Sequence, residues 1–457
     1  MNEGFHKVRP GRACAAVGLL LAAALGWSQG RAGAAVAAAD DWRQFRGPNG
    51  SGLAPAGAKP PRTWSATENV AWKSPLPGPG SSSPIVVGAR VFVTCYSGYG
   101  DGRGTGSPET LKRHLVCLDR ATGRVLWDQA VAADLPEDSY TGYLTEHGYA
   151  SSTPVSDGER VYVFFGKTGA LAFDLEGRQL WKVNLGKESG NRRWGSGASP
   201  VLHKNLLIVN ASEESRTVRA LDTATGREVW KAEGGTLELC YSTPTVVSAA
   251  SGEELLLAVP GELWGMNPDT GKLRWFASTG IGGNVSPSVV AADGVAFVTG
   301  GFPRLAAAAV RLGGKGDVTQ THVLWTGQNA SYVPSPVIAG GRLFVATDTG
   351  FALCLDAKDG RQVFKERLPG AAASGRGGKP FYASAVLADG HVYAVSRRNG
   401  TFVFAAQPEF KLVAQNSLAG DDSDFNATPA IAGGQLFLRS NRQLYCIAAG
   451  PAAGARP

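Results

Sequence analysis

The stretch Leu118-Asp-Arg-Ala-Thr-Gly-Arg-Val-Leu-Trp127 returns almost unchanged as Leu221-Asp-Thr-Ala-Thr-Gly-Arg-Glu-Val-Trp230. In this pattern an Asp or Asn side chain folds onto the backbone two residues ahead, and the Gly supplies the positive φ that starts a return strand. The order of acidic or amide residue, Gly and aromatic occurs at Asp119/Gly123/Trp127, Asp174/Gly177/Trp181, Asp222/Gly226/Trp230, Asn267/Gly271/Trp275 and Asp356/Gly360/Phe364. An aromatic at one fixed offset in several copies cannot serve a single asymmetric site, so we interpret these aromatics as structural wedges.

Each copy belongs to a longer unit that opens with a hydroxyl residue, followed in seven of eight cases by Pro. The openings are Ser83-Pro84, Thr153-Pro154, Ser199-Pro200, Thr243-Pro244, Ser286-Pro287, Ser335-Pro336, Ser384-Ala385 and Thr428-Pro429. Their spacing is roughly 45 residues, a period typical of repeat architectures. Short alternating strands, such as Arg160-Val-Tyr-Val-Phe-Phe165, follow the openings. Four antiparallel strands per unit form a blade, so the sequence predicts an all-β, eight-bladed β-propeller.

The last unit lacks its fourth strand, because the chain after Leu444-Tyr-Cys-Ile447 continues into Ala, Gly and Pro. Near the other end, Asn69-Val-Ala-Trp-Lys-Ser-Pro-Leu76 has the pattern of an orphan fourth strand. We therefore predict that residues 69–76 pair with the blade made by residues 425–447. This pairing closes the ring and removes two exposed sheet edges.

The first 39 residues have the pattern of a secretory signal peptide, with Lys7, Arg9 and Arg12 before the uncharged run 13–30 and a small-residue site at 37–39. An uncleaved membrane anchor is the alternative, because the run is at the short end of spanning length. The predicted organisation is a signal peptide 1–39, a lead-in with the closing strand 40–80, the propeller 81–450 and a disordered tail 451–457. We expect an exported monomer, periplasmic or secreted.

Composition excludes two broad classes of protein. A hydrophobic content of 43% excludes a disordered chain. The formal net charge of +7 is modest for this length, and no cluster of Lys and Arg with interleaved aromatics is present. Nucleic acid is therefore not the expected partner.

The openings, the Leu-Asp-x-x-Thr-Gly-x-x-x-Trp motif and the eightfold count together resemble the PQQ-like (pyrroloquinoline-quinone-like) repeat family, over about Trp42 to Gly450. The segment Trp42-Arg-Gln-Phe-Arg-Gly-Pro-Asn-Gly50 resembles one that opens many exported propellers of this kind. The resemblance implies the fold but leaves the function open. The family includes quinone- and calcium-dependent alcohol and sugar dehydrogenases as well as non-enzymatic scaffolds such as BamB.

Two features of the quinoprotein dehydrogenases are missing from the sequence. It has no adjacent Cys-Cys pair and no C-x-x-C-H haem motif. Cys117, Cys354 and Cys446 align at one repeat position, which predicts a slot for small buried side chains. Cys95 and Cys117 fall on neighbouring strands and form the only plausible disulfide. We expect no cofactor, and keep pyrroloquinoline quinone with calcium, in an alcohol or sugar dehydrogenase, as the alternative.

The loops that lead into the first strand of each blade differ from blade to blade and converge around the channel, where propellers bind ligands. They carry aromatic, charged and amide side chains: Glu146, His147, Tyr149, Arg193, Trp194, Glu238, Tyr241, Asn284, Tyr332, Tyr382, Asp424 and Asn426. These residues are consistent with a solvated rim or with a pocket for a small molecule, an envelope protein or a peptide. We favour a binding or scaffold protein, with no catalytic residue and no metal ligand assigned.

Overall fold

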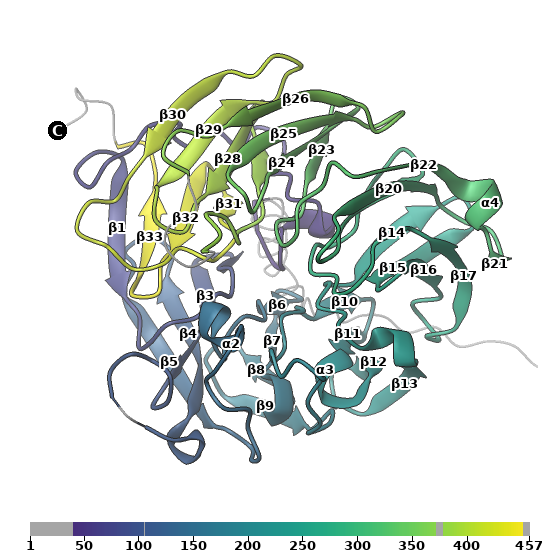
Figure 1. Ribbon diagram of the computed structural model, residues 1–457. Helices are drawn as coiled ribbons and strands as arrows, with labels where there is room; N and C mark the ends of the chain where they lie inside the picture. Colours follow the sequence, from purple (N-terminus) through teal and green to yellow (C-terminus); the bar gives the residue numbers. More distant parts are fainter. Residues whose placement is uncertain (1–39, 105, 372–377, 451–457) are drawn as a thin grey trace, which may run out of the picture.

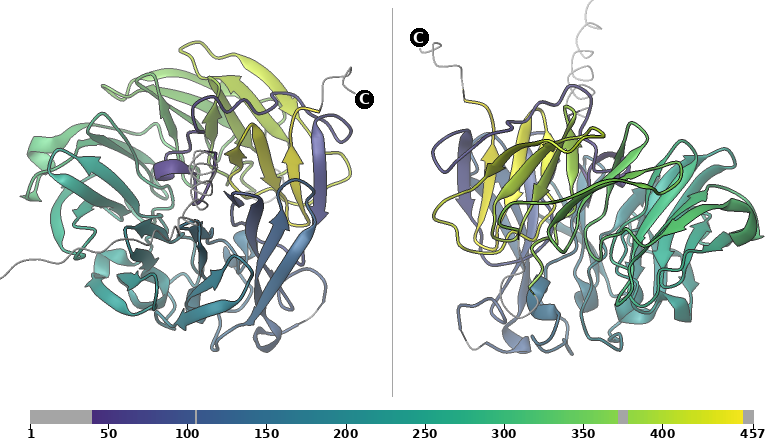
Figure 2. Two further views of the ribbon diagram at one scale, coloured as in Figure 1. Left: turned by 180° about the vertical axis from the view of Figure 1, so that it is seen from behind. Right: turned by 45° about the horizontal axis from the view of Figure 1, so that its top comes forward.

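A computed structural model describes residues 40–104, 106–371 and 378–450, so the predicted signal peptide and tail lie outside the described residues. Eight sheets stand around a central channel (Figures 1 and 2). All strands of the blades pair antiparallel, and each blade has its first strand at the channel and its fourth at the periphery. The predicted eight-bladed propeller is confirmed.

Each blade has four strands, which are consecutive in the chain except in the fifth blade and in the closing blade. The first four blades comprise β2–β5 (Ile85–Val87, Arg90–Ser97, Lys112–Asp119, Val125–Ala132), β6–β9 (Val155–Ser156, Arg160–Phe164, Ala170–Asp174, Gln179–Val183), β10–β13 (Val201–His203, Leu206–Ala211, Thr217–Asp222, Glu228–Glu233) and β14–β17 (Thr245–Ala249, Gly252–Val259, Glu262–Met266, Leu273–Ser278). The next three comprise β18, β19, β20 and β22 (Val290–Ala292, Val295–Gly300, Ala306–Arg311, Val323–Gly327), β23–β26 (Val337–Ala339, Arg342–Ala346, Phe351–Asp356, Gln362–Arg367) and β27–β30 (Val386–Ala388, His391–Val395, Thr401–Ala405, Leu412–Asn416).

The ring closes as predicted. The eighth blade combines β31–β33 (Ala430–Ala432, Gln435–Arg439, Gln443–Ile447) with β1 (Val70–Pro75), and β1 pairs antiparallel with β33. In Figure 1 this junction is visible where the purple β1 lies beside the yellow β33. Trp72 of β1 is buried against this blade, so the closing strand supplies core as well as backbone hydrogen bonds.

At five of the eight junctions a Trp locks one blade to the next. The Trp181 indole N–H donates to the carbonyl of Thr223 at 3.0 Å, and its ring covers Gly226 in the turn of the following blade. A Cβ on Gly226 would lie 2.8 Å from that ring, and its φ is +72°, so the turn needs Gly for two reasons. The same N–H to carbonyl contact is made by Trp72, Trp127, Trp230 and Trp325. Trp325 was not among the predicted wedges.

The predicted slot for small side chains lies directly across the strand pair from these aromatics. Cys117 is opposite Trp127, Cys354 is opposite Phe364, and Cys446 is opposite Trp72. A small residue leaves room for the large ring on the neighbouring strand. All five cysteines in the described ranges are buried and free, so Cys95 and Cys117 are not bridged.

The hydroxyl openings have a structural role that their repetition did not reveal. The backbone N–H of Ser83 donates to Thr153 Oγ1 of the next blade at 2.9 Å. Equivalent links join Thr153 to Ser199, Ser199 to Thr243, Ser288 to Ser335, Ser335 to Ser384, and Ser384 to Thr428. In the fifth blade the linking residue is Ser288, two residues before β18, and the predicted opening at Ser286 is wrong by two positions. The Ser-Pro pair there belongs to the preceding loop.

The segment around Trp42–Ala54 crosses the channel at the end where the first hairpin turns of the blades lie. Trp42 exchanges two backbone hydrogen bonds with Val86 on β2, and Leu387 on β27 does the same with Gly52 and Ala54. The fully buried Arg46 donates to the carbonyls of Ser335 and Pro336 as well as to those of its own segment. The segment thus seals part of this end of the channel.

The helices within the described ranges are single turns in loops. They are η1 (Pro48–Gly50), η2 (Pro108–Thr110), α2 (Leu144–His147), η3 (Gly166–Thr168), α3 (Ser212–Ser215), η4 (Gly235–Leu237) and α4 (Thr319–His322). A two-residue strand, β21 (Gly316–Asp317), adds in parallel to β17. Among the described residues, none of the helices has the length and apolar character needed to cross a membrane.

Candidate functional site

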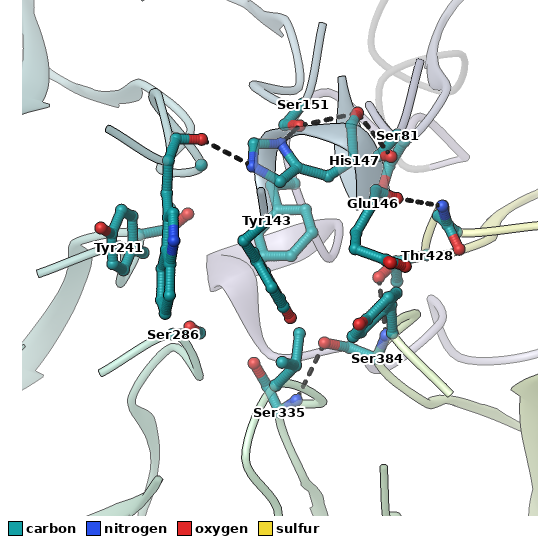
Figure 3. A pocket seen from close by; sticks show the side chains of 18 residues that line it. Ser81, Tyr143, Glu146, His147, Ser151, Tyr241, Ser286, Ser335, Ser384 and Thr428 are labelled. Atoms are coloured by element: carbon teal, nitrogen blue, oxygen red, sulfur yellow. Dashed lines mark hydrogen bonds between the residues drawn. The ribbon is translucent and has the colours of Figure 1, made fainter. Parts of the chain in front are cut away.

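A pocket of about 140 Å³ occupies the channel at the end where the loops lead into the first strand of each blade (Figure 3). We call it the upper pocket. Phe45 of the crossing segment lies at its base, and α2 lies at its mouth. Its lining residues are Phe45, Ser81, Ser83, Tyr143, Glu146, His147, Ser151, Trp194, Gly197, Tyr241, Thr243, Ser286, Val333, Ser335, Tyr382, Ser384, Asn426 and Thr428. They come from many blades, as expected for a site on the axis.

The large insertion of the first blade carries α2 over the mouth of the channel, where it contacts the seventh and eighth blades. The Glu146 carboxylate accepts from Arg397 Nη1 at 2.7 Å, and Arg397 Nη2 donates to Asp424 at 2.7 Å. Asn426 Nδ2 donates to the Glu146 carbonyl. Burial acts to lower the pKa of Arg397, but Asp424 and Glu146 outweigh it and raise the pKa, so the guanidinium stays charged. The carboxylate at the mouth of the pocket is therefore neutralised by its neighbour.

His147 is held as a neutral imidazole. Its Nε2 lies 2.8 Å from the carbonyl of Trp194, which fixes the proton on Nε2, and its Nδ1 lies 2.6 Å from the Ser151 hydroxyl. Burial lowers the pKa of His147 to about 4. Because both ring nitrogens are occupied, this side chain orients α2 and Trp194 and has no free nitrogen for proton transfer.

Aromatic rings form the wall of the pocket. The ring of Tyr143 lies 4.6 Å from that of Trp194, and Tyr241 stacks on Trp194 at 5.7 Å. Tyr382 meets Tyr143 edge to face at 5.9 Å, and the Arg397 guanidinium lies 4.7 Å from its ring. Burial raises the pKa of Tyr143 and of Tyr382, so both phenols stay protonated. The column Tyr143–Trp194–Tyr241 covers both faces of the indole and leaves ring edges toward the pocket.

Hydroxyl groups from successive blades also line the pocket. Four of them, Thr243, Ser335, Ser384 and Thr428, already accept the backbone N–H links between blades. A hydroxyl that accepts in this way retains its O–H proton for donation. Within the described ranges, none of the four donates to a protein group, so their protons are available to a ligand.

The structure brings six of the predicted site residues together and separates the others. Those in the pocket lining are Glu146, His147, Trp194, Tyr241, Tyr382 and Asn426. Asp424 lies just behind them and anchors Arg397. Asn284 donates to the Tyr332 hydroxyl at 2.8 Å, and both side chains are buried outside the lining.

The remaining three predicted residues serve other places. Tyr149 belongs to an aromatic cluster under the first-blade insertion, where its hydroxyl donates to the carbonyl of Asp138. Arg193 is exposed and has a positive φ of 51°, so it is a turn residue. Glu238 accepts from the backbone N–H of Asn191, which shapes the loop carrying Trp194.

Sequence reasoning missed Tyr143, Arg397 and Phe45. Tyr143 lies in the same insertion as Glu146 and has the same bias toward aromatics, so it could have been included. Arg397 and Phe45 carried no such signal, because neither lies in a loop that leads into a first strand. Phe45 reaches the site on the crossing segment, and Arg397 reaches it on the hairpin between β28 and β29 of the seventh blade.

A second polar cluster lies beneath the loops of the second and third blades. Arg113 pairs with Glu137 at 2.6 Å and Lys167 with Asp138 at 2.9 Å, all four side chains being buried. Next to them are Glu213 and Glu214 on α3, and burial raises the pKa of each to about 7. Because Arg113 and Lys167 are already paired with other carboxylates, burial of Glu213 and Glu214 disfavours their charged forms.

The upper pocket does not fit pyrroloquinoline quinone with calcium. That quinone has three carboxylates, which require cationic partners, and a flat ring system, which requires a free planar surface. Among the lining residues, Glu146 is the only charged side chain, and both faces of Trp194 are covered. In the part of the chain that the structure describes, no group of three or more His, Cys, Asp or Glu is placed to hold a metal ion.

Comparisons with known proteins agree on the fold. The family described as outer membrane protein assembly factor BamB matches residues 111–366 and 317–414. BamB from Moraxella catarrhalis superimposes with a TM-score of 0.58 at 10% identity, covering 85% of this chain and 99% of that chain. The computationally designed Ika8 protein gives 0.53 at 11%, covering 82% and 98%.

Quinohemoprotein alcohol dehydrogenase ADHIIG from Pseudomonas putida HK5 gives a TM-score of 0.48 at 12% identity, covering 92% of this chain and 82% of that chain. The curated proteins include no match. At such identities the solved structures bear on the fold alone, because function in a shared fold depends on the site. The family match spans well over half of the chain, from the third strand of the first blade into the seventh blade. This chain belongs to the PQQ-like propeller family described as outer membrane protein assembly factor BamB.

Proposed function

We propose that this protein is an exported binding protein that holds a small, neutral, oxygen-rich ligand, such as a polyol or a monosaccharide, in the upper pocket. The observation that carries the proposal is the set of hydroxyls in the lining. Thr243, Ser335, Ser384 and Thr428 have O–H protons to donate and share the pocket with aromatic rings such as Tyr143 and Tyr382. Oxygen acceptors on a ligand match the hydroxyls, and its C–H groups match the aromatic rings.

Charge and protonation support a neutral ligand. The Glu146 carboxylate is compensated by Arg397, and His147 is uncharged. Both ring nitrogens of His147 have protein partners, and one oxygen of Glu146 is paired with Arg397. The arrangement is therefore better suited to holding a molecule than to moving a proton.

Export and a role in the cell envelope are part of the proposal. The pattern of residues 1–39 supports export. The family description, which names an outer membrane assembly factor, supports an envelope setting and a function as a scaffold for other proteins.

The test uses the full chain and measures its melting temperature and heats of binding with glycerol, D-glucose, myo-inositol and the anion D-gluconate. A ligand at about ten times its dissociation constant should raise the melting temperature by about 1 to 3 °C. Ser286→Leu should abolish binding, because Ser286 lines the pocket but makes no interblade link. Ser278→Leu, on the exposed outer strand β17, is the matched control.

Binding of a neutral ligand that Ser286→Leu removes and Ser278→Leu keeps would support the proposal. If no neutral compound binds while gluconate does, the ligand class is wrong. Turnover of alcohols or sugars after addition of quinone and Ca²⁺ would overturn the proposal in favour of a dehydrogenase.

A further inference from the structure

The innermost strand of every blade turns one edge toward the channel, and the chain itself already uses several of these edges. The crossing segment pairs with Val86 of β2 through hydrogen bonds of 3.0 and 2.9 Å, and with Leu387 of β27 through two of 2.8 Å. Ser156 of β6 donates to the carbonyl of Arg43 at 2.9 Å. The channel therefore accepts an extended polypeptide along its inner edges.

On the other side of the channel a groove borders the corresponding edges, although η1 of the crossing segment lies against the Thr245 end of β14. A groove of about 600 Å³, which we call the lower groove, lies between the crossing segment and β10, β14 and β18. Phe45 and Thr243 line both the lower groove and the upper pocket, so they lie between the two. Figure 1 shows β10 and β14 beside the centre of the ring, opposite β31 and β28.

The strand β14 is the best developed of these edges. It has five residues, whereas β10 and β18 have three each. Its hairpin pairs Ala249 with Gly252 across a two-residue turn, so the alternation of antiparallel bonds directs the N–H and C=O groups of Val246 and Ser248 into the channel. Ser248 is one residue before the pair that flanks the turn. Val86 and Leu387, which bind the crossing segment, occupy the same position in their own hairpins.

The residues that carry these backbone groups are at least partly exposed. Val246 is half-buried and Ser248 is exposed. No residue in the described ranges makes a backbone hydrogen bond to the channel side of either residue. Such an edge is a template for an added strand.

The rim of the lower groove has an excess of negative charge. Lys204 is paired with Asp269 at 2.9 Å, while Glu253 and Asp293 have no Lys or Arg partner among the described residues. The Glu253 side chain is 47% exposed, and its nearest ionisable neighbour is His203 at 3.9 Å. A basic side chain on the added strand would match this rim.

We propose that the lower groove binds an extended segment of a partner polypeptide that carries a basic side chain and adds as a strand to the channel edge of β14. Backbone pairing at Val246 and Ser248 provides the affinity, and the carboxylates of Glu253 and Asp293 select the basic residue. The proposal is independent of the ligand in the upper pocket.

The test measures fluorescence anisotropy of a labelled peptide, acetyl-Thr-Val-Lys-Val-Thr-amide, with the full chain. Two further peptides are N-methylated, one at the odd and one at the even positions. Because only one alternating set of N–H groups faces β14, one methylated peptide should bind at least about tenfold more weakly and the other almost unchanged. Equal binding of both methylated peptides, or no binding of the parent peptide, would overturn the proposal.

Variants of the protein locate the binding. Ser248→Pro removes one N–H that faces the channel without removing a bond to β15, and should weaken binding about fivefold. The pair Glu253→Gln and Asp293→Asn should weaken binding and reduce its salt dependence. Glu228→Gln, an exposed carboxyl on the outer strand β13, is the matched control and should change neither.

Melting temperatures of all variants verify folding. If Ser248→Pro fails to fold, the variant with Glu253→Gln and Asp293→Asn still decides the outcome, because these side chains take no part in the backbone hydrogen bonds of the sheet. Unchanged affinity in both variants would place the peptide elsewhere and contradict the proposal. Ser286→Leu should leave peptide binding unaffected, so a failed peptide test and a failed ligand test remain distinguishable.

Discussion

The outer rim of the ring and the mouth of its channel are built in opposite ways. At the rim, one contact recurs: the Trp181 indole donates to a carbonyl and covers a turn Gly of the next blade, and Trp72, Trp127, Trp230 and Trp325 do the same. At the mouth, the loops add a varied set of aromatic, charged and amide side chains to the repeated hydroxyls. Repetition at the rim holds the ring together, and variation at the mouth provides a site with distinct groups on each side.

One junction where the rim pattern fails, between the fourth and fifth blades, shows how much depends on the neighbouring turn. The fifth blade replaces its Gly turn by an insertion that contains β21 and α4. Trp275 of the preceding blade has no turn carbonyl to reach, so its indole donates to the buried Glu254 of its own blade at 3.1 Å. The ring lies over Gly265, where a Cβ would be only 2.0 Å away. The same residue type at the same offset thus adopts two different environments.

Removal of the closing strand should have the largest effect on the rim. A chain that begins at Ser81 loses β1 and with it Trp72, which alone is worth about 3 to 5 kcal/mol as a buried large side chain. It also exposes the edge of β33. We expect loss of cooperative unfolding in calorimetry. A melting transition equal to that of the full chain would show that the ring does not need closure.

A pair of Trp substitutions tests the contrast between rim and mouth directly. Trp230→Ala should lower the free energy of unfolding by about 3 to 5 kcal/mol, because Trp230 is buried between two blades. Trp194→Ala should lower it by only about 1 to 2 kcal/mol, since aromatic contacts are lost but no sealed cavity forms. Denaturant unfolding measures both values. Similar losses for the two variants would contradict the division into a stabilising rim and a binding mouth.

The buried carboxyls of α3 predict a smaller effect that depends on pH. The pKa of Glu214 is raised to about 7 by burial, from an ordinary value of 4.5. Between these values the folded protein binds more protons than the unfolded chain, so stability falls as the pH rises from about 4.5 to about 7 and levels off above. Glu214→Gln should flatten this slope and stabilise the protein at pH 8, by an amount on the order of 1 to 3 kcal/mol.

Urea unfolding at pH 5, 6, 7 and 8 measures the slope for Glu214→Gln. The control is Glu228→Gln, whose carboxyl is exposed on β13 and should leave the slope unchanged. An unchanged slope in Glu214→Gln would mean that this carboxyl is ionised in the folded protein at pH 5.

The fold was predictable because its determinants are local and repeated. The Asp–Gly turns, the openings and the orphan strand 69–76 are each recognised from residues close together in the sequence. Because the unit is repeated eight times, an irregular copy does not hide the pattern. The one error of position, at Ser286, arose where a Ser-Pro pair in a loop imitates the opening made by Ser288. Half of the predicted site residues were found in the pocket, because loops on one face of a ring must converge, but the turn taken by each loop decides which side chain points inward.

The sequence alone determined the number of blades, the wedges at their junctions and the strand that closes the ring, since these depend on residue types at fixed spacing. Only the tertiary structure decided what surrounds the channel. Arg397 meets Glu146 across 251 residues, and Phe45 and Thr243 lie between the upper pocket and the lower groove. The crossing segment forms backbone hydrogen bonds with some inner edges but none with β14. Contacts of this kind join segments that share no local pattern, so no spacing along the chain encodes them, and they form only when the ring closes.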